Sequence, residues 1–212
     1  MSGRGRHAPI LSTGRLEAVT DGIFTVGMTL LVVGLQVPEP GLSAEALHRA
    51  LRGLLPQFLV FLLCFYLLGK LWVEQLHVSA HLRRVDRIGL MLHLLWLLQV
   101  VLLPFTSDLM GTYPEVFVSQ ALFHLNLFGL GFLPWFLWCR CARRGFLDES
   151  LSSDEEVRIR RRGLALPGTA LGVLGLAWFA PDQSSLVYLL LPVLRRVLDR
   201  WGDQGVRGPA SS

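Results

Sequence analysis

Long apolar stretches with almost no charged residues constrain the fold of this chain more than any other feature of its sequence. They recur along all 212 residues, of which 52% are hydrophobic and only 17% charged. A soluble domain usually has about a quarter charged residues, whereas a helix that crosses the hydrocarbon core of a bilayer needs about 20 apolar residues. The sequence therefore predicts an all-α membrane protein with six transmembrane helices and short loops.

Proline and polar residues separate the predicted spans. Pro38 and Pro40 follow the first span, and Pro104 with the polar residues after it ends the third. The sixth span is short and also fits a re-entrant or buried segment. A short amphipathic segment over residues 43–53 precedes the second span. The predicted spans cover residues 16–37, 54–73, 88–105, 116–138, 164–180 and 185–198, inside a transmembrane domain of residues 15–200 that follows an N-terminal segment (1–14) and precedes a disordered tail (201–212).

The arginines are distributed unevenly between the two sides that six alternating spans define. They concentrate in the N-terminal segment, the loops after the second and fourth spans, and the tail, all of which share one side. Only Arg49 and Arg52 fall on the other side. The positive-inside rule then places both termini in the cytoplasm and the protein in the cytoplasmic membrane. Residues 148–162, which mix acids with arginines, fit a solvated helix that leads into the fifth span.

Several functional classes find no support in the sequence. The net charge of +4 is dispersed between apolar stretches, so it does not form the basic face that binds nucleic acid. Cys64, Cys139 and Cys141 form neither a disulfide framework nor a zinc motif. No metalloprotease, nucleophile-elbow or nucleotide-binding motif occurs. We therefore expect no enzyme activity, no metal site and no organic cofactor.

The first span carries the most informative pattern. Asp21, an ionisable residue near its start, is either an interfacial helix cap or part of a fixed cluster that orients the helix. Val26, Thr29, Leu30 and Val33 follow helical spacing and share one face. That face is either an ordinary packing surface or, if several copies surround an axis, the lining of a pore with an apolar gate and a ring of hydroxyls.

Other polar residues lie within the predicted spans. Gly27 and Gly34 allow close approach of a second helix to the first span. His93 lies in the third span, and His124 and Asn126 lie in the fourth. Such residues either hold helices together by hydrogen bonds or take part in a pore or proton relay. The histidine spacing indicates no metal site.

Several segments together resemble a known family of membrane proteins. Residues 15–24 (RLEAVTDGIF) and 29–33 (TLLVV) are similar to the signature that opens the first helix in the prokaryotic branch of the transmembrane protein 175 family of potassium channels. Trp72, the segment 84–93 and the segment 102–107 (LLPFTS) extend the resemblance. The family implies a homotetramer of six-helix subunits, in which the first helix of each subunit lines a central potassium-permeable pore.

The resemblance also assigns roles to individual residues of the first helix. Arg15, Thr20 and Asp21 match the signature positions. Val26 matches the hydrophobic constriction, Thr29 a pore-facing hydroxyl, and Val33 a further pore-lining position, as the resemblance implies. The sequence departs from the signature at Val19 (for Phe), at Thr20 (for Ser), at His93 (for Asn), and at Gln75 and Leu76 (for a pair of histidines).

The primary hypothesis from the sequence is a potassium-permeable cation channel in the bilayer, assembled from four copies of the chain. No T-V-G-Y-G-like loop is present, so a filter of backbone carbonyls is not expected. A proton channel or proton-coupled transporter that uses Asp21, His93 and His124 is one alternative. A membrane scaffold that conducts no ions is the other.

Overall fold

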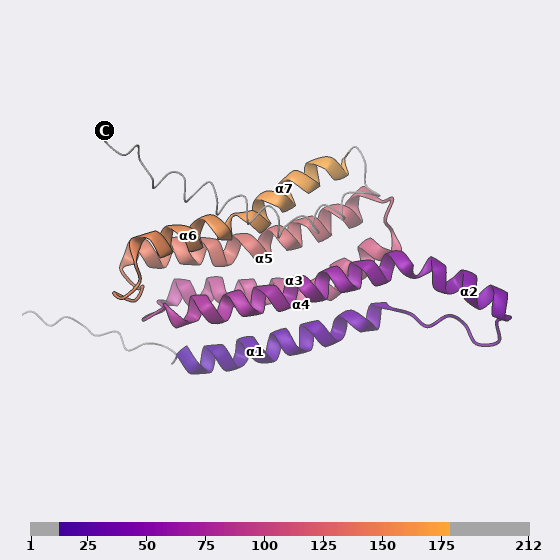
Figure 1. The fold of residues 1–212 in the computed structure, drawn as a ribbon, viewed down its shortest axis with the longest axis horizontal. Helices are drawn as coiled ribbons and strands as arrows, with labels where there is room; N and C mark the ends of the chain where they lie inside the picture. Colours follow the sequence, from indigo (N-terminus) through magenta and orange to yellow (C-terminus); the bar gives the residue numbers. More distant parts are fainter. Residues whose placement is uncertain (1–12, 179–212) are drawn as a thin grey trace, which may run out of the picture.

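The computed structural model describes residues 13–178 and folds them into a bundle of long helices that run side by side (Figure 1). The chain enters the bundle through α1, whose last turn tightens into a short 3-10 helix. The elements are α1 (Thr13–Leu30), η1 (Leu31–Gly34), α2 (Ala44–Gly53), α3 (Leu55–Ala80), α4 (Arg87–Thr112), α5 (Phe117–Arg144), α6 (Ser153–Gly163) and α7 (Ala165–Ala177).

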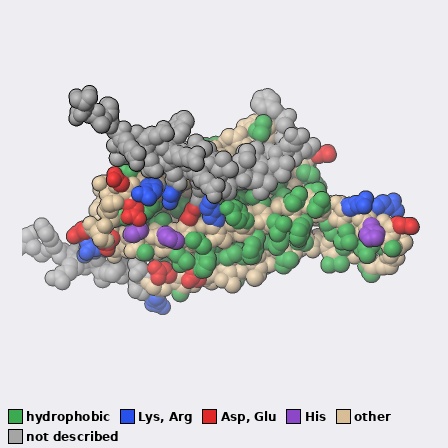
Figure 2. All heavy atoms as spheres, in the orientation of Figure 1, with side chains coloured by type: hydrophobic (Ala, Val, Ile, Leu, Met, Phe, Trp, Pro, Cys, Tyr) green, Lys and Arg blue, Asp and Glu red, His purple; other side chains and the backbone are tan. Residues whose placement is uncertain are grey.

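Four of these helical segments are long and apolar enough to cross a membrane, namely Gly14–Gly34, Leu55–Ala80, Arg87–Thr112 and Phe117–Arg144. Figure 2 shows charged side chains gathered towards the two ends of the bundle, with hydrophobic side chains between them. The predicted all-α, multi-pass membrane fold is therefore confirmed. The fifth predicted span corresponds to α7, and the sixth span (185–198), the tail and residues 1–12 lie outside the described residues.

Helix α4 occupies the centre of the bundle and packs against α1, α3 and α5, while α7 packs against α5. The core includes Trp96 and Val100 of α4, Leu68 of α3 and Leu127 of α5, all at most 2% exposed. Apolar side chains also cover the outside of the bundle, as the lipid environment requires. Hydrophobicity alone therefore does not distinguish the inner from the outer face of these helices.

The predicted end of the third span at Pro104 is wrong. Helix α4 continues through Pro104 to Thr112. Proline lacks the backbone N–H that would bond to the Val100 carbonyl. One turn later, the Ser107 hydroxyl donates to the Pro104 carbonyl at 3.0 Å, and the Thr106 hydroxyl oxygen lies 3.2 Å from Leu103 O. Because the bilayer offers no water to unpaired backbone groups, a helix that passes through proline is more stable there than an early end.

The second and fourth spans extend further than predicted, for a related reason. Helix α3 continues to Ala80 instead of residue 73, and α5 to Arg144 instead of residue 138. Hydropathy detects only the part of a helix inside the hydrocarbon, whereas the helix itself ends at a backbone signal. In α5 that signal is Gly145, whose positive φ of 66° favours glycine. The first span instead ends early, at Gly34 rather than residue 37.

Both short helices that the sequence predicted outside the spans are present. Helix α2 begins after Ser43, whose side chain accepts a hydrogen bond from the backbone N–H of Ala46 at 3.2 Å. Helix α6 begins after Ser152, which accepts from Glu155 at 3.2 Å. A serine side chain at this position satisfies a backbone donor that has no partner within the helix.

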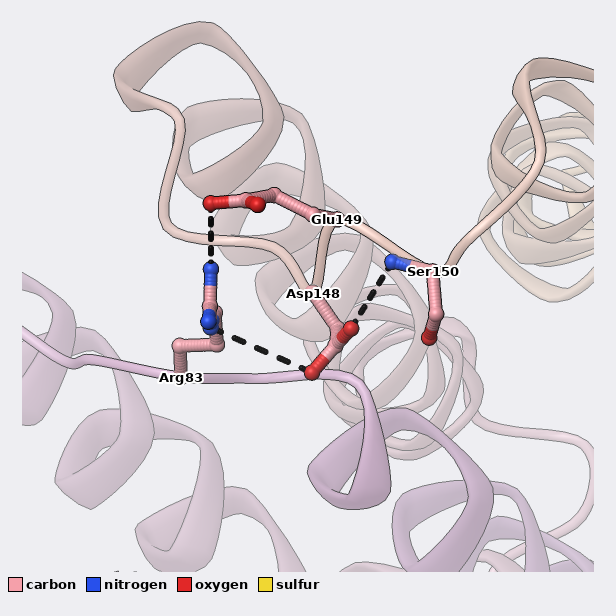
Figure 3. A network of polar contacts seen from close by, with 4 residues as sticks. All are labelled: Arg83, Asp148, Glu149 and Ser150. Carbon is pink, nitrogen blue, oxygen red and sulfur yellow. Dashed lines mark hydrogen bonds and ion pairs between the residues drawn. The ribbon is translucent and has the colours of Figure 1, made fainter.

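Loops 81–86 and 145–152 form what we call the basic end of the bundle, where they pair with each other. The backbone N–H of Arg83 donates to Phe146 O at 3.0 Å, and that of Asp148 donates to His81 O at 2.9 Å. The Arg83 guanidinium contacts Glu149 at 2.6 Å and Asp148 at 3.9 Å (Figure 3). These contacts place two of the predicted arginine-rich loops on the same side of the bundle.

A second ion pair at the basic end fixes the start of α4. Asp86 caps this helix by accepting a hydrogen bond from the backbone N–H of Gly89 at 2.8 Å. The same carboxylate accepts from the Arg140 guanidinium of α5 at 2.5 Å. The bond from Arg140, ahead of the one from Gly89, holds the pKa of Asp86 below its ordinary value. Asp86 thus ties the α4 N-terminus to the end of α5.

Candidate pore-lining helix

Helix α1 has two chemically different faces. Only 22% of its most apolar 18-residue window is buried, compared with 50% for α5, so most of α1 has no neighbour among residues 13–178. Successive residues of a helix are rotated by about 100°. Thr20, Phe24 and Leu31 therefore share one face and are buried, while Val26 and Val33, on the opposite face, are 55% and 71% exposed.

The outward face contains the stripe that the sequence singled out. Val26, Thr29 and Val33 lie near its middle, and all three are exposed. The Thr29 hydroxyl donates its proton to the Val26 carbonyl at 2.8 Å, which leaves the hydroxyl oxygen as an acceptor on the surface. Leu30 lies at the edge of the face, where it lines an open apolar groove with Val101 of α4.

Two residues of this face were missed at the sequence level. Gly22 and Thr25 are exposed beside the predicted stripe. The Thr25 hydroxyl donates to the Asp21 carbonyl at 2.8 Å, so its oxygen is an outward acceptor like that of Thr29. The spacing of four residues between the two threonines is the signal that could have identified the pair.

The inward face is anchored to α4 by a buried hydrogen bond. The Thr20 hydroxyl oxygen lies 2.8 Å from His93 Nε2 and 2.8 Å from the Leu16 carbonyl oxygen. A hydroxyl has one proton, which Thr20 donates to Leu16, so His93 Nε2 carries a hydrogen and donates it to Thr20. His93 is thus a helix-contact residue, one of the two roles that the sequence left open.

A second polar contact anchors α1 to α3. Trp72 Nε1 donates to Asp21 Oδ1 at 2.8 Å. Asp21 lies inside α1 rather than at its N-terminus, which favours the orienting cluster over the helix cap among the two predicted roles. Arg15 is exposed and forms no ion pair among the described residues.

Aromatic rings and close glycine contacts complete the anchored face. The Phe24 ring lies 5.3 Å from the Trp96 ring, and Trp96 Nε1 donates to the Leu130 carbonyl of α5 at 3.0 Å. As predicted, the two glycines allow close approach: a Cβ on Gly27 would lie 3.2 Å from Val100, and one on Gly34 would lie 3.0 Å from Asp108. Contacts at several positions along α1, from Thr20 to Gly34, therefore fix the orientation of the helix.

A small pocket of about 30 Å³ lies beside the polar anchors. Thr20, Asp21 and His93 line it together with Gln75 and Leu76, and all of these except Asp21 depart from the family signature. The pocket is large enough for a water molecule and offers several polar partners. It lies on the anchored side of α1, away from the stripe.

The remaining predicted polar residues lie elsewhere in the bundle. Asn126 of α5 donates to Gln99 Oε1 at 2.8 Å and accepts from Thr106 at 3.2 Å, so it joins α5 to α4. His124 is fully buried and stacks edge-on against Phe123. Thr106, the partner of Asn126, lies 13 positions after His93 in α4, which is about 20 Å along the helix axis. The relay of Asp21, His93 and His124 stays a prediction.

The two faces of α1 differ in what they offer to a neighbour. One face is locked by buried polar and aromatic contacts, and the other presents valine side chains and threonine oxygens. Among residues 13–178, no three His, Cys, Asp or Glu side chains lie close enough to hold a metal ion. The fold defines a multi-pass helical membrane protein.

Comparisons with known proteins show similarity to one family of channels. The model of the family described as endosomal/lysosomal potassium channel TMEM175 matches residues 15–104. A potassium channel of Streptomyces collinus is 29% identical over 158 residues, which cover 73% of this chain and 76% of that protein. The mouse endosomal/lysosomal proton channel TMEM175 is 34% identical over 105 residues, which cover 46% of this chain and 21% of that protein. The chain is thus similar to the TMEM175 family over residues 15–104, and its likeness to a bacterial potassium channel fits the prokaryotic branch.

A solved structure supports the same fold. The lysosomal potassium-selective channel TMEM175 homolog from Chamaesiphon minutus matches with a TM-score of 0.69 and 24% identity. The match covers 92% of this chain and 98% of that one. The likeness therefore extends over nearly the whole of both chains, well beyond the segment that the family model matches.

Proposed function

We propose that this chain is one subunit of a potassium-permeable channel, in which four copies surround an axis and α1 of each copy lines the pore. The outward face of α1 carries the proposal: Val26, Thr29 and Val33 are exposed on a helix that a buried Thr20–His93 contact and an exposed Trp72–Asp21 hydrogen bond join to its neighbours. The potassium channels among its relatives support the choice of ion.

In a ring of four copies, the outward face of α1 would contact the neighbouring copies and line the pore. The groove between Leu30 and Val101 offers an apolar seat for the α1 helix of a neighbouring copy. Val26 would then form the apolar constriction, which passes ions only when it is wetted. The Thr25 and Thr29 oxygens would face the pore as acceptors that replace part of the ion's hydration shell. Ions would move passively, without enzyme chemistry or a cofactor.

The orientation in the membrane follows from the distribution of charge. Arg83 and Arg84 of loop 81–86 lie at the basic end, together with Arg143 and Arg144 of α5, which directly precede loop 145–152. Cytoplasmic loops carry an excess of such residues. The proposal therefore places the basic end, and with it the start of α1, in the cytoplasm, with the protein in the cytoplasmic membrane.

Flux from liposomes tests the pore assignment. Substituting Val26→Trp fills the proposed constriction, and Val26→Asn keeps it hydrated. We expect the tryptophan variant to lower potassium flux at least tenfold, and the asparagine variant to raise it and to weaken discrimination against sodium. Leu62→Trp is the matched control, because Leu62 is 45% exposed on α3. Unchanged flux in both Val26 variants would remove α1 from the pore, and no flux from a verified tetramer would favour the scaffold.

Proton permeation is a second candidate, which the mouse relative's description as a proton channel favours. The same liposomes, loaded with a pH-sensitive dye and placed in a proton gradient, separate the two candidates. Proton flux without potassium flux would replace the primary proposal. Because both ions would pass the Val26 ring, Val26→Trp should lower either flux.

A further inference from the structure

Helix α2 has an apolar face that nothing in the described part of the chain covers. Leu47 and Leu51 share this face with Ala44 and are 40% and 50% exposed. No residue of α2 is buried. Arg49 lies on the opposite face, and His48 and Arg52 lie along the flank between the two faces. Figure 2 shows arginine side chains along one edge of this part of the molecule and hydrophobic ones along another.

The connection to α3 places α2 at the boundary of the membrane. The apolar span begins at Leu55, directly after α2 ends at Gly53. Pro56 lacks the N–H that would bond to the Arg52 carbonyl, so the two helices do not continue as one. Figure 1 shows α2 extending past the end of α1 and bent relative to the bundle. A bent amphipathic helix at this level meets the interface between lipid and water.

The two arginines of α2 are available for an external partner. Among the described residues, Arg49 and Arg52 take part in none of the ion pairs, which join Arg83 and Arg140 to acids at the basic end. Both lie on the side that the positive-inside rule leaves poor in arginine. Guanidinium groups bind phosphate oxygens through two parallel hydrogen bonds. Arginines beside an apolar helix face therefore match the phosphates of lipid headgroups.

We propose that α2 lies in the membrane–water interface, with Leu47 and Leu51 at the acyl boundary and Arg49 and Arg52 bound to lipid phosphates, preferentially those of anionic lipids. The proposal assigns a lipid-binding surface to the side of the protein opposite the basic end. It depends only on the membrane fold and is independent of ion conduction. The quenching experiments below and the flux experiments above can therefore fail separately.

Depth-dependent quenching tests the position of α2 in the full-length protein. An environment-sensitive fluorophore is attached at Leu51→Cys and, as the matched control on the other face, at Arg49→Cys, with the native cysteines replaced. In phosphatidylcholine–phosphatidylglycerol vesicles, we expect spin-labelled lipid to quench the Leu51 probe and aqueous iodide to quench the Arg49 probe. Equal quenching of both by iodide would place α2 in water. A Leu51 probe shielded from both quenchers would place it against a second copy of the chain; either result overturns the proposal.

Lipid preference tests the arginines separately. Quenching of a probe at Leu51→Cys is compared for spin-labelled phosphatidylglycerol and phosphatidylcholine, with and without Arg49→Gln and Arg52→Gln. At low ionic strength, each arginine removed should lower the preference for the anionic lipid about fivefold, as about 1 kcal/mol per basic residue near the surface implies. Arg158→Gln with Arg161→Gln in α6 makes the same change of charge at the other end and should have no effect. An unchanged preference in the α2 variant overturns the role of Arg49 and Arg52.

Discussion

The buried contact between Thr20 and His93 gives the sharpest test of how α1 is held. Thr20→Val keeps the branched shape of the side chain but replaces its hydroxyl with a methyl group. The hydroxyl lies 2.8 Å from His93 Nε2 and 2.8 Å from Leu16 O, and both Thr20 and His93 are 3% exposed. The substitution therefore removes two hydrogen bonds without opening a cavity.

The two lost bonds are unequal in free energy. Leu16 O keeps its main-chain partner within α1, so its loss contributes little. His93 Nε2–H is left buried without an acceptor, and an unsatisfied buried donor costs about 1–3 kcal/mol. Unfolding midpoints of chains of this size shift by roughly 2–4 °C per kcal/mol. The expected decrease in Tm is therefore about 2–12 °C.

Thermal unfolding of the purified protein in one detergent measures this shift, with Thr20→Ser as the matched control because it keeps the hydroxyl. The double variant Thr20→Val with His93→Leu should recover part of the loss, since replacing both partners by apolar groups leaves no donor unsatisfied. A Thr20→Val protein as stable as the wild type would refute the reasoning. Additive effects of the two substitutions would show that the residues act independently.

Two further predictions concern the packing and the basic end. Gly131→Ala should lower the free energy of unfolding by about 1–3 kcal/mol, because its Cβ would lie 2.5 Å from Pro167 Cδ; Gly69→Ala, with no described atom within 4 Å, is the control for thermal unfolding. The Arg140 bond lowers the folded-state pKa of Asp86 below 3.8, so its stabilisation is fully present above that pH and is lost as pH falls through the folded pKa. Asp86→Asn should remove this part of the acid dependence of Tm, and an identical acid profile for both proteins would contradict the assignment.

The sequence predicted the helical membrane fold well and the helix ends poorly. Apolar stretches report which residues the bilayer accepts, and that information was sufficient to locate the four described spans. A helix, however, ends where its backbone hydrogen bonds end. Pro104 therefore did not stop α4, and α5 continued past its apolar part to Gly145. Neither result can be derived from hydropathy.

The sequence predicted which residues of α1 form the candidate site, but it did not predict which residues of other helices contact them. Helical spacing identified the stripe of Val26, Thr29 and Val33, but a stripe that faces lipid, a pore or another helix is apolar in all three cases. The partners of Thr20 and Asp21 lie on other helices, 73 and 51 residues further along the chain. Spacing within one helix carries no information about such contacts.

Two of the departures from the family signature lie on α1, one on each face of the helix. Thr20, in place of serine, keeps the hydroxyl that His93 uses, so the anchored face retains its polar contact. Val19, in place of phenylalanine, is 49% exposed and lines the groove shared by Val26 and Val101. The aromatic ring missing there would not belong to the core of a single subunit. Its loss acts on whatever covers this groove, which in the proposed tetramer is the neighbouring α1, and leaves the fold of the subunit intact.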